Sequence, residues 1–253
     1  MELKIGAQLY TLRNFMQTPD DIAATLKRVK EMGFDVVQLS GHGPIDPQRL
    51  ADIVNGLDLD VCITHTPYDR LLHDLDNVIA EHRLFGCDAV GLGAMPEQFR
   101  NSAEGVRSFL SEITPVAEKL AAEGMRFGYH NHNFEFEAFG GRRVIDMMIE
   151  DAPKSFGFIL DTYWVQAGGG DPASFVRKVA GRMKVIHFKD MTIFGGKQDF
   201  APVGEGNIDF LPVIAALRET GVAYIVIEQD TCHSDPFDCL ATSKRNIEAM
   251  LNK

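Results

Sequence analysis

The sequence contains no apolar run long enough to cross a membrane. A membrane-spanning helix needs roughly 18 or more predominantly apolar consecutive residues, and the apolar runs of this chain are much shorter. The N-terminus enters a predicted strand directly, without the apolar segment typical of a signal peptide. We therefore expect a soluble, cytoplasmic protein with no membrane partner.

Basic residues are also scarce. The chain has 25 Lys and Arg against 36 Asp and Glu, which gives a formal net charge of -11. Such a charge repels the phosphates of nucleic acids unless a local basic patch intervenes. Nucleic acid is therefore not an expected partner.

Cysteine is rare, and its spacing carries no recognisable motif. The four cysteines, Cys62, Cys87, Cys232 and Cys239, include no CxxC pair. In a chain that we expect in the cytosol, such cysteines are typically reduced and mostly packed. Cys232 is the one that we expect close to the polar strand ends described below.

Eight short apolar runs, each bounded by turn signals, predict strands that are buried on both faces. Segments with helical patterns separate them and begin after residues that suit helix starts. The predicted strands are LKIGAQL, FDVVQLS, DVCITH, DAVGLG, MRFGYHN, FGFILD, MKVIHF and AYIVIEQ. The predicted helices begin after Thr18, Asp46, Asp74, Asn101, Gly141, Asp171, Asn207 and Asp235.

Proline and glycine mark the ends of these helices. Proline is favoured in a first helical turn, and glycine is favoured where the chain leaves a helix in a left-handed conformation. The prolines are Pro19, Pro47, Pro172 and Pro236, and the glycines are Gly33, Gly86, Gly124 and Gly221. Local signals therefore agree with the strand and helix alternation throughout.

The alternation predicts an α/β fold, a single (β/α)8 TIM barrel. The 253 residues, 45% of them hydrophobic, are enough for one domain that covers residues 1–253. An open, doubly wound sheet is the competing topology. However, its GxGxxG signature is missing from the first strand-to-helix turn, which reads GAQLYTLR.

Metal-competent side chains stand at the ends of four predicted strands. Asp161, His187 and Glu228 each follow an apolar run, and a fourth run leads into His130 and His132. In a closed barrel the C-terminal strand ends meet at one mouth, where the active site lies. Two carboxylates and an imidazole suit a borderline or hard cation and leave positions open for substrate oxygens. The sequence therefore predicts one metal site at this mouth.

Several motifs carry a family resemblance over essentially the whole chain. The runs LDTYWVQAGG, HFKDM, PVGEGNIDF and VIEQD occur in that order, and GAQLYTLR and THTPYDRL precede them. This pattern resembles the sugar phosphate isomerase/epimerase group of the xylose-isomerase-like TIM barrels. The resemblance implies a divalent ion, manganese, cobalt, magnesium or zinc, held by Glu, Asp, His and Glu from strands five to eight. Asp161, His187 and Glu228 match the last three positions.

The fifth strand departs from this pattern. It carries His130 where the ketose epimerases have a glutamate. Strand alternation places His130 and His132 on one face, so both are candidates for the remaining ligand. Glu135 or Glu137 in the following loop are further alternatives.

The resemblance implies a metal-dependent sugar isomerase or epimerase that acts beside the carbonyl of a keto-sugar or polyol-derived ketone. Ketose epimerases of this group use two glutamates to remove and return a proton, and Glu228 alone matches that pair. Return of the proton would then need His130, His132, Lys189 or a water. Members often form dimers or tetramers, so a homo-oligomer is a further expectation.

Three other classes deserve weighing. YHNHNF resembles the histidine-rich fifth strand of inosose dehydratases, which suggests a dehydratase or eliminase acting on inosose or 3-keto-glycoside substrates. A non-catalytic metal- or sugar-binding barrel is another alternative, because the second glutamate is missing. An abasic-site endonuclease is disfavoured by the acidic charge and the short ligand list.

Further residues are candidates for functional roles at the barrel mouth. Lys189 could neutralise an enediolate or protonate a leaving oxygen, although Lys189 and Asp190 could also form an ordinary solvated pair. His65 ends the third predicted strand and suits proton transfer, a substrate contact or a hydrogen-bonded core position. The long segment after His187 suggests a lid or pocket wall. Candidate substrate contacts are Gln8, Tyr10, Arg13, Trp164 and Glu205.

Arg13 is the natural contact for a phosphate or carboxylate. The glycine run at 168–170 suggests a mobile loop or a backbone nest.

Overall fold

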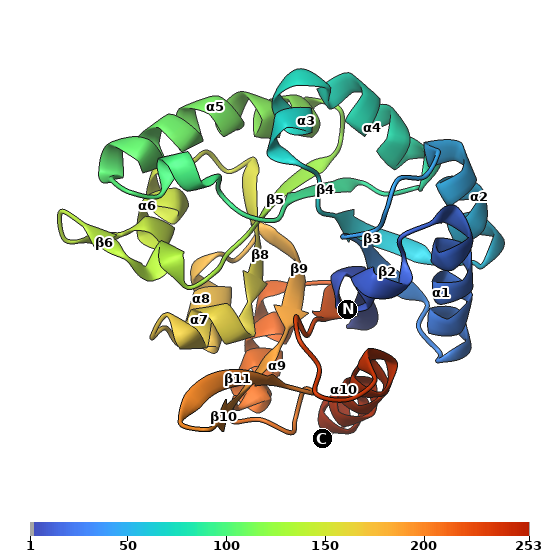
Figure 1. The fold of residues 1–253 in the computed structure, drawn as a ribbon. Coiled ribbons are helices and arrows are strands. Elements are labelled where there is room, and N and C mark those ends of the chain that lie inside the picture. Colours follow the sequence, from blue (N-terminus) through green and yellow to red (C-terminus); the bar gives the residue numbers. More distant parts are fainter. Residues whose placement is uncertain (1–2, 253) are drawn as a thin grey trace.

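A computed structural model describes residues 3–252, in which eight parallel strands form one sheet in the order β3-β2-β1-β12-β9-β8-β5-β4 (Figure 1). All eight lie within the segments predicted as strands. Their bounds are β1 Lys4–Gln8, β2 Val36–Leu39, β3 Asp60–Thr64, β4 Ala89–Leu92, β5 Arg126–His130, β8 Phe156–Asp161, β9 Met183–Phe188 and β12 Tyr224–Ile227.

The sheet curves into a nearly closed barrel. Within residues 3–252 its edge strands β3 and β4 share no ladder. Just beyond β3, the Thr66 N–H donates to the Gly91 carbonyl at 2.7 Å, so the two edges meet near the mouth. The predicted (β/α)8 fold is confirmed.

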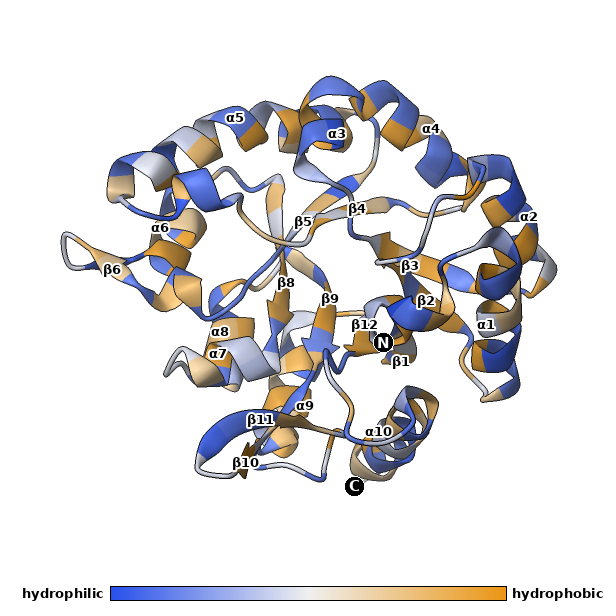
Figure 2. Cartoon of the chain, viewed as in Figure 1, coloured by the Kyte–Doolittle hydropathy of each residue, from blue (hydrophilic) through white to orange (hydrophobic). Residues whose placement is uncertain are grey.

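Helices surround the barrel (Figure 1). Their bounds are α1 Pro19–Glu31, α2 Pro47–Gly56, α3 Tyr68–His73, α4 Leu75–Leu84, α5 Ala103–Ala122, α6 Val144–Asp151, α7 Thr162–Ala167, α8 Pro172–Lys178, α9 Phe210–Thr220 and α10 Pro236–Leu251. Strands are mainly apolar and the helices are mixed, with polar residues on their outer faces (Figure 2). Among residues 3–252, none of the helices combines the length and apolarity that crossing a membrane requires.

The core has two parts. A large apolar cluster lies between the sheet and the helices. A smaller one joins strand residues around the barrel, namely Val36, Cys62, Ile63, Ala89, Ile159, Val185 and Val226. Apolar side chains thus fill part of the barrel and leave polar residues for the C-terminal strand ends.

The predicted helix signals are present. Pro19, Pro47, Pro172 and Pro236 each open a helix. The residue before each proline, Thr18, Asp46, Asp171 and Asp235, accepts a backbone hydrogen bond as N-cap. Gly33, Gly86, Gly124 and Gly221 have φ of +82°, +66°, +75° and +72°, as a left-handed helix end requires.

Some elements were not predicted. The segment after β9 contains a hairpin, β10 Asp190–Phe194 and β11 Lys197–Ala201, and a second short hairpin joins β6 Ala138–Phe139 to β7 Arg142–Arg143. Short 3-10 turns also occur at η1 Leu9–Phe15, η2 Glu97–Phe99 and η3 Phe134–Phe136. Helix α7 begins directly after β8, because the Asp161 side chain caps it.

The glycine run after α7 serves close packing. A Cβ on Gly168 or Gly170 would lie 2.3 or 2.7 Å from the Phe136 side chain. The four cysteines are free thiols, and Cys62, Cys87 and Cys239 are buried while Cys232 is half-buried.

Candidate active site

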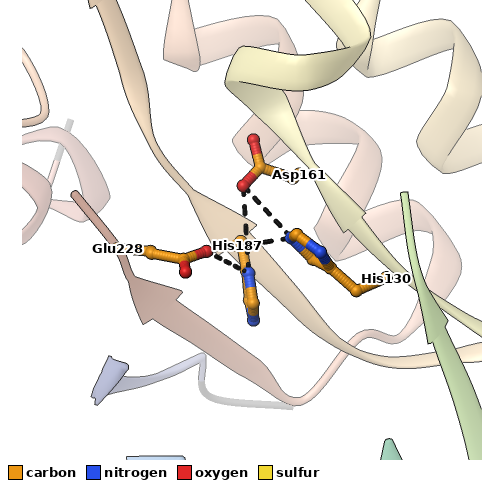
Figure 3. Close-up of side chains that lie close together, drawn as sticks. All are labelled: His130, Asp161, His187 and Glu228. Carbon is orange, nitrogen blue, oxygen red and sulfur yellow. Dashed lines mark hydrogen bonds and ion pairs between the residues drawn. The ribbon is translucent and has the colours of Figure 1, made fainter. Parts of the chain in front are cut away.

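Four residues converge at the C-terminal ends of neighbouring strands (Figure 3). His130 ends β5, Asp161 ends β8, His187 lies near the end of β9, and Glu228 directly follows β12. One potential ligand atom from each lies within 4.8 Å of the others, and all four side chains are buried. The parallel strands therefore bring together residues that lie up to a hundred positions apart in the sequence.

Hydrogen bonds orient both imidazoles of this group. The His187 Nε2 lies 2.7 Å from the Gln38 Oε1 on β2, and the His130 Nδ1 lies 3.1 Å from the Gly93 carbonyl oxygen. Each of these oxygens accepts an N–H, which fixes the tautomer of the neutral ring. His187 Nδ1 and His130 Nε2 then face the two carboxylates, and His130 Nε2 lies within hydrogen-bond distance of Asp161 Oδ2 at 3.3 Å.

The two oxygens of the Asp161 carboxylate have different roles. Its Oδ1 accepts the backbone N–H of Trp164 at 3.0 Å and caps α7. Its Oδ2 faces the group, 3.3 Å from His130 Nε2 and 3.9 Å from His187 Nδ1. The Asp161 backbone N–H donates to the Asn131 Oδ1 at 3.1 Å, which holds this strand end in place.

Two buried atoms in the group lack hydrogen-bond partners. His187 Nδ1 and Glu228 Oε2 lie 2.7 Å apart, yet neither makes a hydrogen bond within the described residues. A lone pair facing a carboxylate oxygen is unfavourable when buried, unless a proton or cation lies between them. Two imidazoles and two carboxylates suit a borderline or hard divalent ion. The residues present therefore fit such an ion.

The surroundings set the charges of this group. Burial lowers the pKa of His187, whereas the pKa of His130 is raised despite burial because Asp161 and Glu228 lie beside it. Burial alone would raise the pKa of Glu228, but the Lys189 ammonium holds that pKa well below its usual range. Glu228 is consequently a carboxylate at neutral pH.

Lys189 is buried beside the same carboxylates. Its Nζ lies 2.7 Å from Asp230 Oδ2, 3.6 Å from Asp161 Oδ2 and 3.9 Å from Glu228 Oε2. Burial disfavours its charge, but these three carboxylates raise its pKa. The side chain therefore keeps its proton within the site.

The sequence also allowed Lys189 and Asp190 to form an ordinary solvated pair, and this alternative is wrong. Asp190 is buried, and its carboxylate accepts the backbone N–H groups of Gly204, Gly206 and Ile208 at 2.9, 3.0 and 3.1 Å. It therefore binds the segment between β11 and α9 to the end of β9. Lys189 pairs with Asp230 instead.

His65 and His132 both lie beside the group without belonging to it, and the His132 ring centroid is 4.8 Å from that of His130. The His65 ring centroid is 5.2 Å from that of His130 and 5.7 Å from that of His187. His132 stacks on Phe134, with centroids 5.4 Å apart. Burial lowers the pKa of His65 well below its usual value and that of His132 to about 2, so both rings are neutral.

The glutamates weighed as fifth-strand ligands point elsewhere. The buried Glu135 carboxylate accepts the Tyr129 hydroxyl and the backbone N–H of His132, and Glu137 is exposed. Neither belongs to the four-residue group. Of the fifth-strand candidates, the structure brings His130 to Asp161, His187 and Glu228.

The candidate substrate contacts have different surroundings. Gln8 is buried and its Nε2 has no hydrogen-bond partner within the described residues. Arg13 donates to the Asp230 carbonyl oxygen at 3.0 Å and lies over the half-exposed Tyr10 ring. The ring centroid of Trp164 lies 5.0 Å from the Lys189 Nζ.

The fifth candidate contact, Glu205, is bound to α10 and does not belong to the group. This exposed side chain accepts a hydrogen bond from the Asn246 amide of α10 at 3.2 Å.

Sequence reasoning missed the residues that position the group. Gln38, Asn131 and Asp230 contact His187, Asp161 and Lys189, and they lie far from these partners in the sequence. One signal was available for Gln38, which is a polar residue within the otherwise apolar β2 run VVQL. A buried amide on an inner strand requires a polar partner.

Glu135 provides a pH-dependent prediction of stability. Burial raises its pKa to about 7 from 4.5. The folded state holds this proton more tightly than the unfolded state, so the associated stability is present below about pH 4.5 and lost as the pH rises through about 7. The free energy of unfolding of the wild type should therefore fall by about 3 kcal/mol between these pH values, and Glu135→Gln should not show this fall. Urea unfolding of both proteins across this range, with chelator present, measures the difference.

The matched control for this prediction is Glu137→Gln, which changes an exposed neighbouring carboxyl. It should keep the pH dependence of the wild type. Parallel stability curves for wild type and Glu135→Gln would contradict the prediction.

Fold and site together define a (β/α)8 barrel with a buried group of two imidazoles and two carboxylates at its C-terminal strand ends. The chain belongs to the xylose isomerase-like TIM barrel family, whose model matches residues 26–249.

Known relatives agree with this assignment. The inosose dehydratase of Lacticaseibacillus casei is 26% identical over 155 residues, which cover 54% of this chain and 52% of that protein. The match thus spans about half the length of this curated relative. A sugar phosphate isomerase/epimerase from Parabacteroides distasonis ATCC 8503 has a TM-score of 0.80 at 22% identity and covers 98% of both chains. An L-ribulose 3-epimerase has a TM-score of 0.75 at 19% identity and covers 99% of this chain and 95% of its own. At these identities the structural matches support the fold.

Proposed function

We propose that this protein is a divalent-metal-dependent enzyme that transfers a proton beside the carbonyl of a keto-sugar or polyol-derived ketone, as an isomerase or epimerase. The observation that carries the proposal is the unpartnered pair of His187 Nδ1 and Glu228 Oε2 within the buried four-residue group. His130, Asp161, His187 and Glu228 would hold the ion. When bound, such an ion acts as a Lewis acid that makes the C–H beside a carbonyl easier to deprotonate.

Glu228 suits the role of general base. It is ionised at neutral pH, because the Lys189 ammonium keeps its pKa low despite burial. A carboxylate within hydrogen-bond reach of a C–H group can accept its proton. Gln38 and Gly93 meanwhile fix the two imidazoles beside this base before substrate binds.

Lys189 suits the role of proton donor. Of the side chains weighed for returning a proton, His132 has too low a pKa to hold one, whereas the ammonium of Lys189 is stabilised by three carboxylates. His130 is engaged with Gly93 and Asp161 and is assigned to the ligand set. His65 is neutral and lies beside both cluster imidazoles, where it would contact a substrate hydroxyl.

The protonated Lys189 beside Glu228 favours dehydration as a second candidate reaction. Glu228 would take the proton next to the carbonyl, and the C–H electron pair would form a carbon–carbon double bond. The β-hydroxyl would leave as its C–O bond breaks, and Lys189 would supply the proton that completes a water molecule. A charged lysine and a single matching glutamate fit this asymmetric reaction.

Deuterium exchange tests the proposal directly. The protein would be incubated with manganese or cobalt and a panel of ketohexoses, inososes and 3-keto-glycosides in deuterated water, and the products followed by NMR. Deuterium at one carbon without loss of water indicates an isomerase or epimerase, and deuterium with loss of water indicates a dehydratase. Absence of exchange with a protein that binds the ion would refute the enzyme and favour a binding barrel.

Replacing Lys189 should separate these two reactions. We expect Lys189→Met to lower water loss by roughly 10²-fold or more, because the buried acid is removed. Deuterium exchange should fall less, with its pH profile moved upward, since Lys189 is a main cause of the low pKa of Glu228. Both rates can be measured in one NMR time course. Lys197→Met, an exposed change on β11, is the matched control, and equal loss of both reactions in Lys189→Met would argue against the acid role.

A further inference from the structure

Two buried glutamine amides lie beside the four-residue group with unused donors. Gln8 ends β1 and Gln38 lies on β2, and both side chains are fully buried. The Nε2 of each has no hydrogen-bond partner among residues 3–252. A buried NH2 group without a partner is unfavourable. Each of these two groups therefore needs an acceptor that the described residues do not supply.

The carbonyl oxygen of each amide is already bound, which fixes the direction of its NH2 group. Gln8 Oε1 accepts the backbone N–H of Tyr10 at 3.0 Å, and Gln38 Oε1 lies 2.7 Å from His187 Nε2. Because these oxygens are engaged, the NH2 groups are what the two amides offer to a ligand. Such donors fit a molecule that presents oxygen atoms with free lone pairs.

Strand register places both amides in the wall of the site. Gln8 is paired with Gln38 in the parallel ladder of β1 and β2. The ladder of β1 and β12 ends one residue before Gln8 and Glu228, so these two residues lie level with each other. Paired residues point to the same face of a sheet, and the contact with His187 shows that Gln38 faces the barrel interior. Gln8 therefore lies between Glu228 and Gln38 on the inner wall.

Unpartnered buried atoms occur on consecutive strands of the sheet. Within the described part of the chain they are His65 Nε2 after β3, Gln38 Nε2 on β2, Gln8 Nε2 on β1, Glu228 Oε2 after β12 and His187 Nδ1 on β9. Since these five strands are neighbours in the sheet order, the atoms line one continuous arc of the mouth. A molecule bound at His187 and Glu228 therefore has the two amides beside it.

The nearby charges favour neutral oxygens over an anion. The ionised Glu228 lies level with Gln8, so a carboxylate or phosphate bound to the amides would lie beside a like charge. The cation of β1 and β2, Lys4, lies at the opposite end of β1 and pairs with Asp60. Hydroxyl oxygens accept hydrogen bonds from amides without adding charge.

We propose that Gln8 and Gln38 bind two hydroxyl groups on neighbouring carbons of the substrate, one hydroxyl to each NH2 group. Adjacent strands lie about 4.8 Å apart, so amides that are paired across them can each reach one oxygen of such a diol. Gln38 then joins the substrate to His187 through a single amide. The inference rests on the proposed function and deepens it, because it requires a free vicinal diol beside the part of the substrate that binds at the four-residue group.

Monodeoxy analogues test this inference. Deuterium exchange would be measured at saturating manganese for the panel ketone that exchanges fastest and for each of its monodeoxy analogues. In the wild type, removal of either hydroxyl of one neighbouring pair should lower kcat/KM by roughly 10- to 100-fold, because a buried NH2 group loses its acceptor. Gln8→Met should bring the ratio of parent to analogue close to one for one hydroxyl of this pair, and Gln38→Met should do so for the other.

Each ratio compares two compounds on the same protein, so an effect of Gln38→Met on His187 cancels. Gln48→Met is the matched control, since it makes the same exchange at an exposed position of α2. It should keep the wild-type ratios. Unchanged ratios in both Gln8→Met and Gln38→Met, or the absence of a sensitive pair of hydroxyls in the wild type, would overturn the inference.

Binding without turnover separates this inference from the proposed function. Sorbitol carries neighbouring hydroxyl groups but no ketone. NMR of protein with isotope-labelled glutamine, in the presence of magnesium, follows the side-chain NH2 signals, which the spectra of Gln8→Met and Gln38→Met assign. Sorbitol should shift both signals with one common dissociation constant.

The outcomes of this titration are distinct. Shifts of both signals, together with no exchange from any ketone, would keep the amide site and refute the enzymatic proposal. Signals of both amides that stay unchanged with sorbitol and with every ketone of the panel would refute the amide site whatever the enzyme does.

Discussion

Glu228→Gln should lower the rate of proton exchange by roughly 10²- to 10⁴-fold, the usual contribution of a general base. The glutamine amide cannot accept the proton, although it has the same shape as the carboxyl group. One oxygen also remains available to an ion, so the comparison is made at saturating manganese. The rate is measured by NMR as deuterium incorporation into the best substrate of the panel.

Loss of the fold should not explain this loss of rate. In the wild type, Glu228 Oε2 lies 2.7 Å from His187 Nδ1 without a hydrogen bond. An amide group there can donate to the imidazole nitrogen, so the metal-free variant should unfold at no lower urea concentration than wild type. Glu219→Gln, which alters an exposed partner of Arg177, should exchange at the normal rate. A normal rate in Glu228→Gln would remove Glu228 from the role of base.

The positions of Asp161, His187 and Glu228 could be predicted because each follows a run of buried strand residues. A parallel barrel places the C-terminal ends of its strands at one mouth, so the topology alone brings such residues together. His130 was less certain, because alternation along β5 gives His130 and His132 the same face. The choice between them depends on where β5 ends and on Gly93, which accepts the His130 Nδ1–H from another loop.

Residues that depend on long-range pairing could not be predicted. The bond between Gln38 and His187 joins β2 to β9, and the pair of Lys189 and Asp230 joins the ends of β9 and β12. Neither pair follows a local periodicity, since register and side-chain direction decide it. The hairpin of β10 and β11 was missed for a related reason. Asp190 at its base is satisfied by amides from residues 204–208, which the sequence presents only as a long loop.

The double variant Asp161→Asn, His187→Ala should lose the divalent ion. It removes one charge and one imidazole from the four-residue group, and metal affinity depends on the number and charge of the ligands. The metal content after gel filtration should fall below about one tenth of an ion per chain. Emission spectrometry on the purified proteins measures this content, without any assumption about the substrate.

The fold should survive this change, because the two replacements were chosen for their other contacts. Asp161 Oδ1 caps α7 through the Trp164 N–H, and asparagine is as good a cap as aspartate. Asp171→Asn together with His233→Ala makes the same two exchanges at the cap of α8 and at an exposed ring, outside the group. Manganese at about 100 times its dissociation constant should stabilise the wild type and this control by about 2.7 kcal/mol and leave the double variant unchanged. A double variant that still carries one ion per chain would show that the metal site lies elsewhere. The unpartnered atoms of His187 and Glu228 would then not be ligands of that ion.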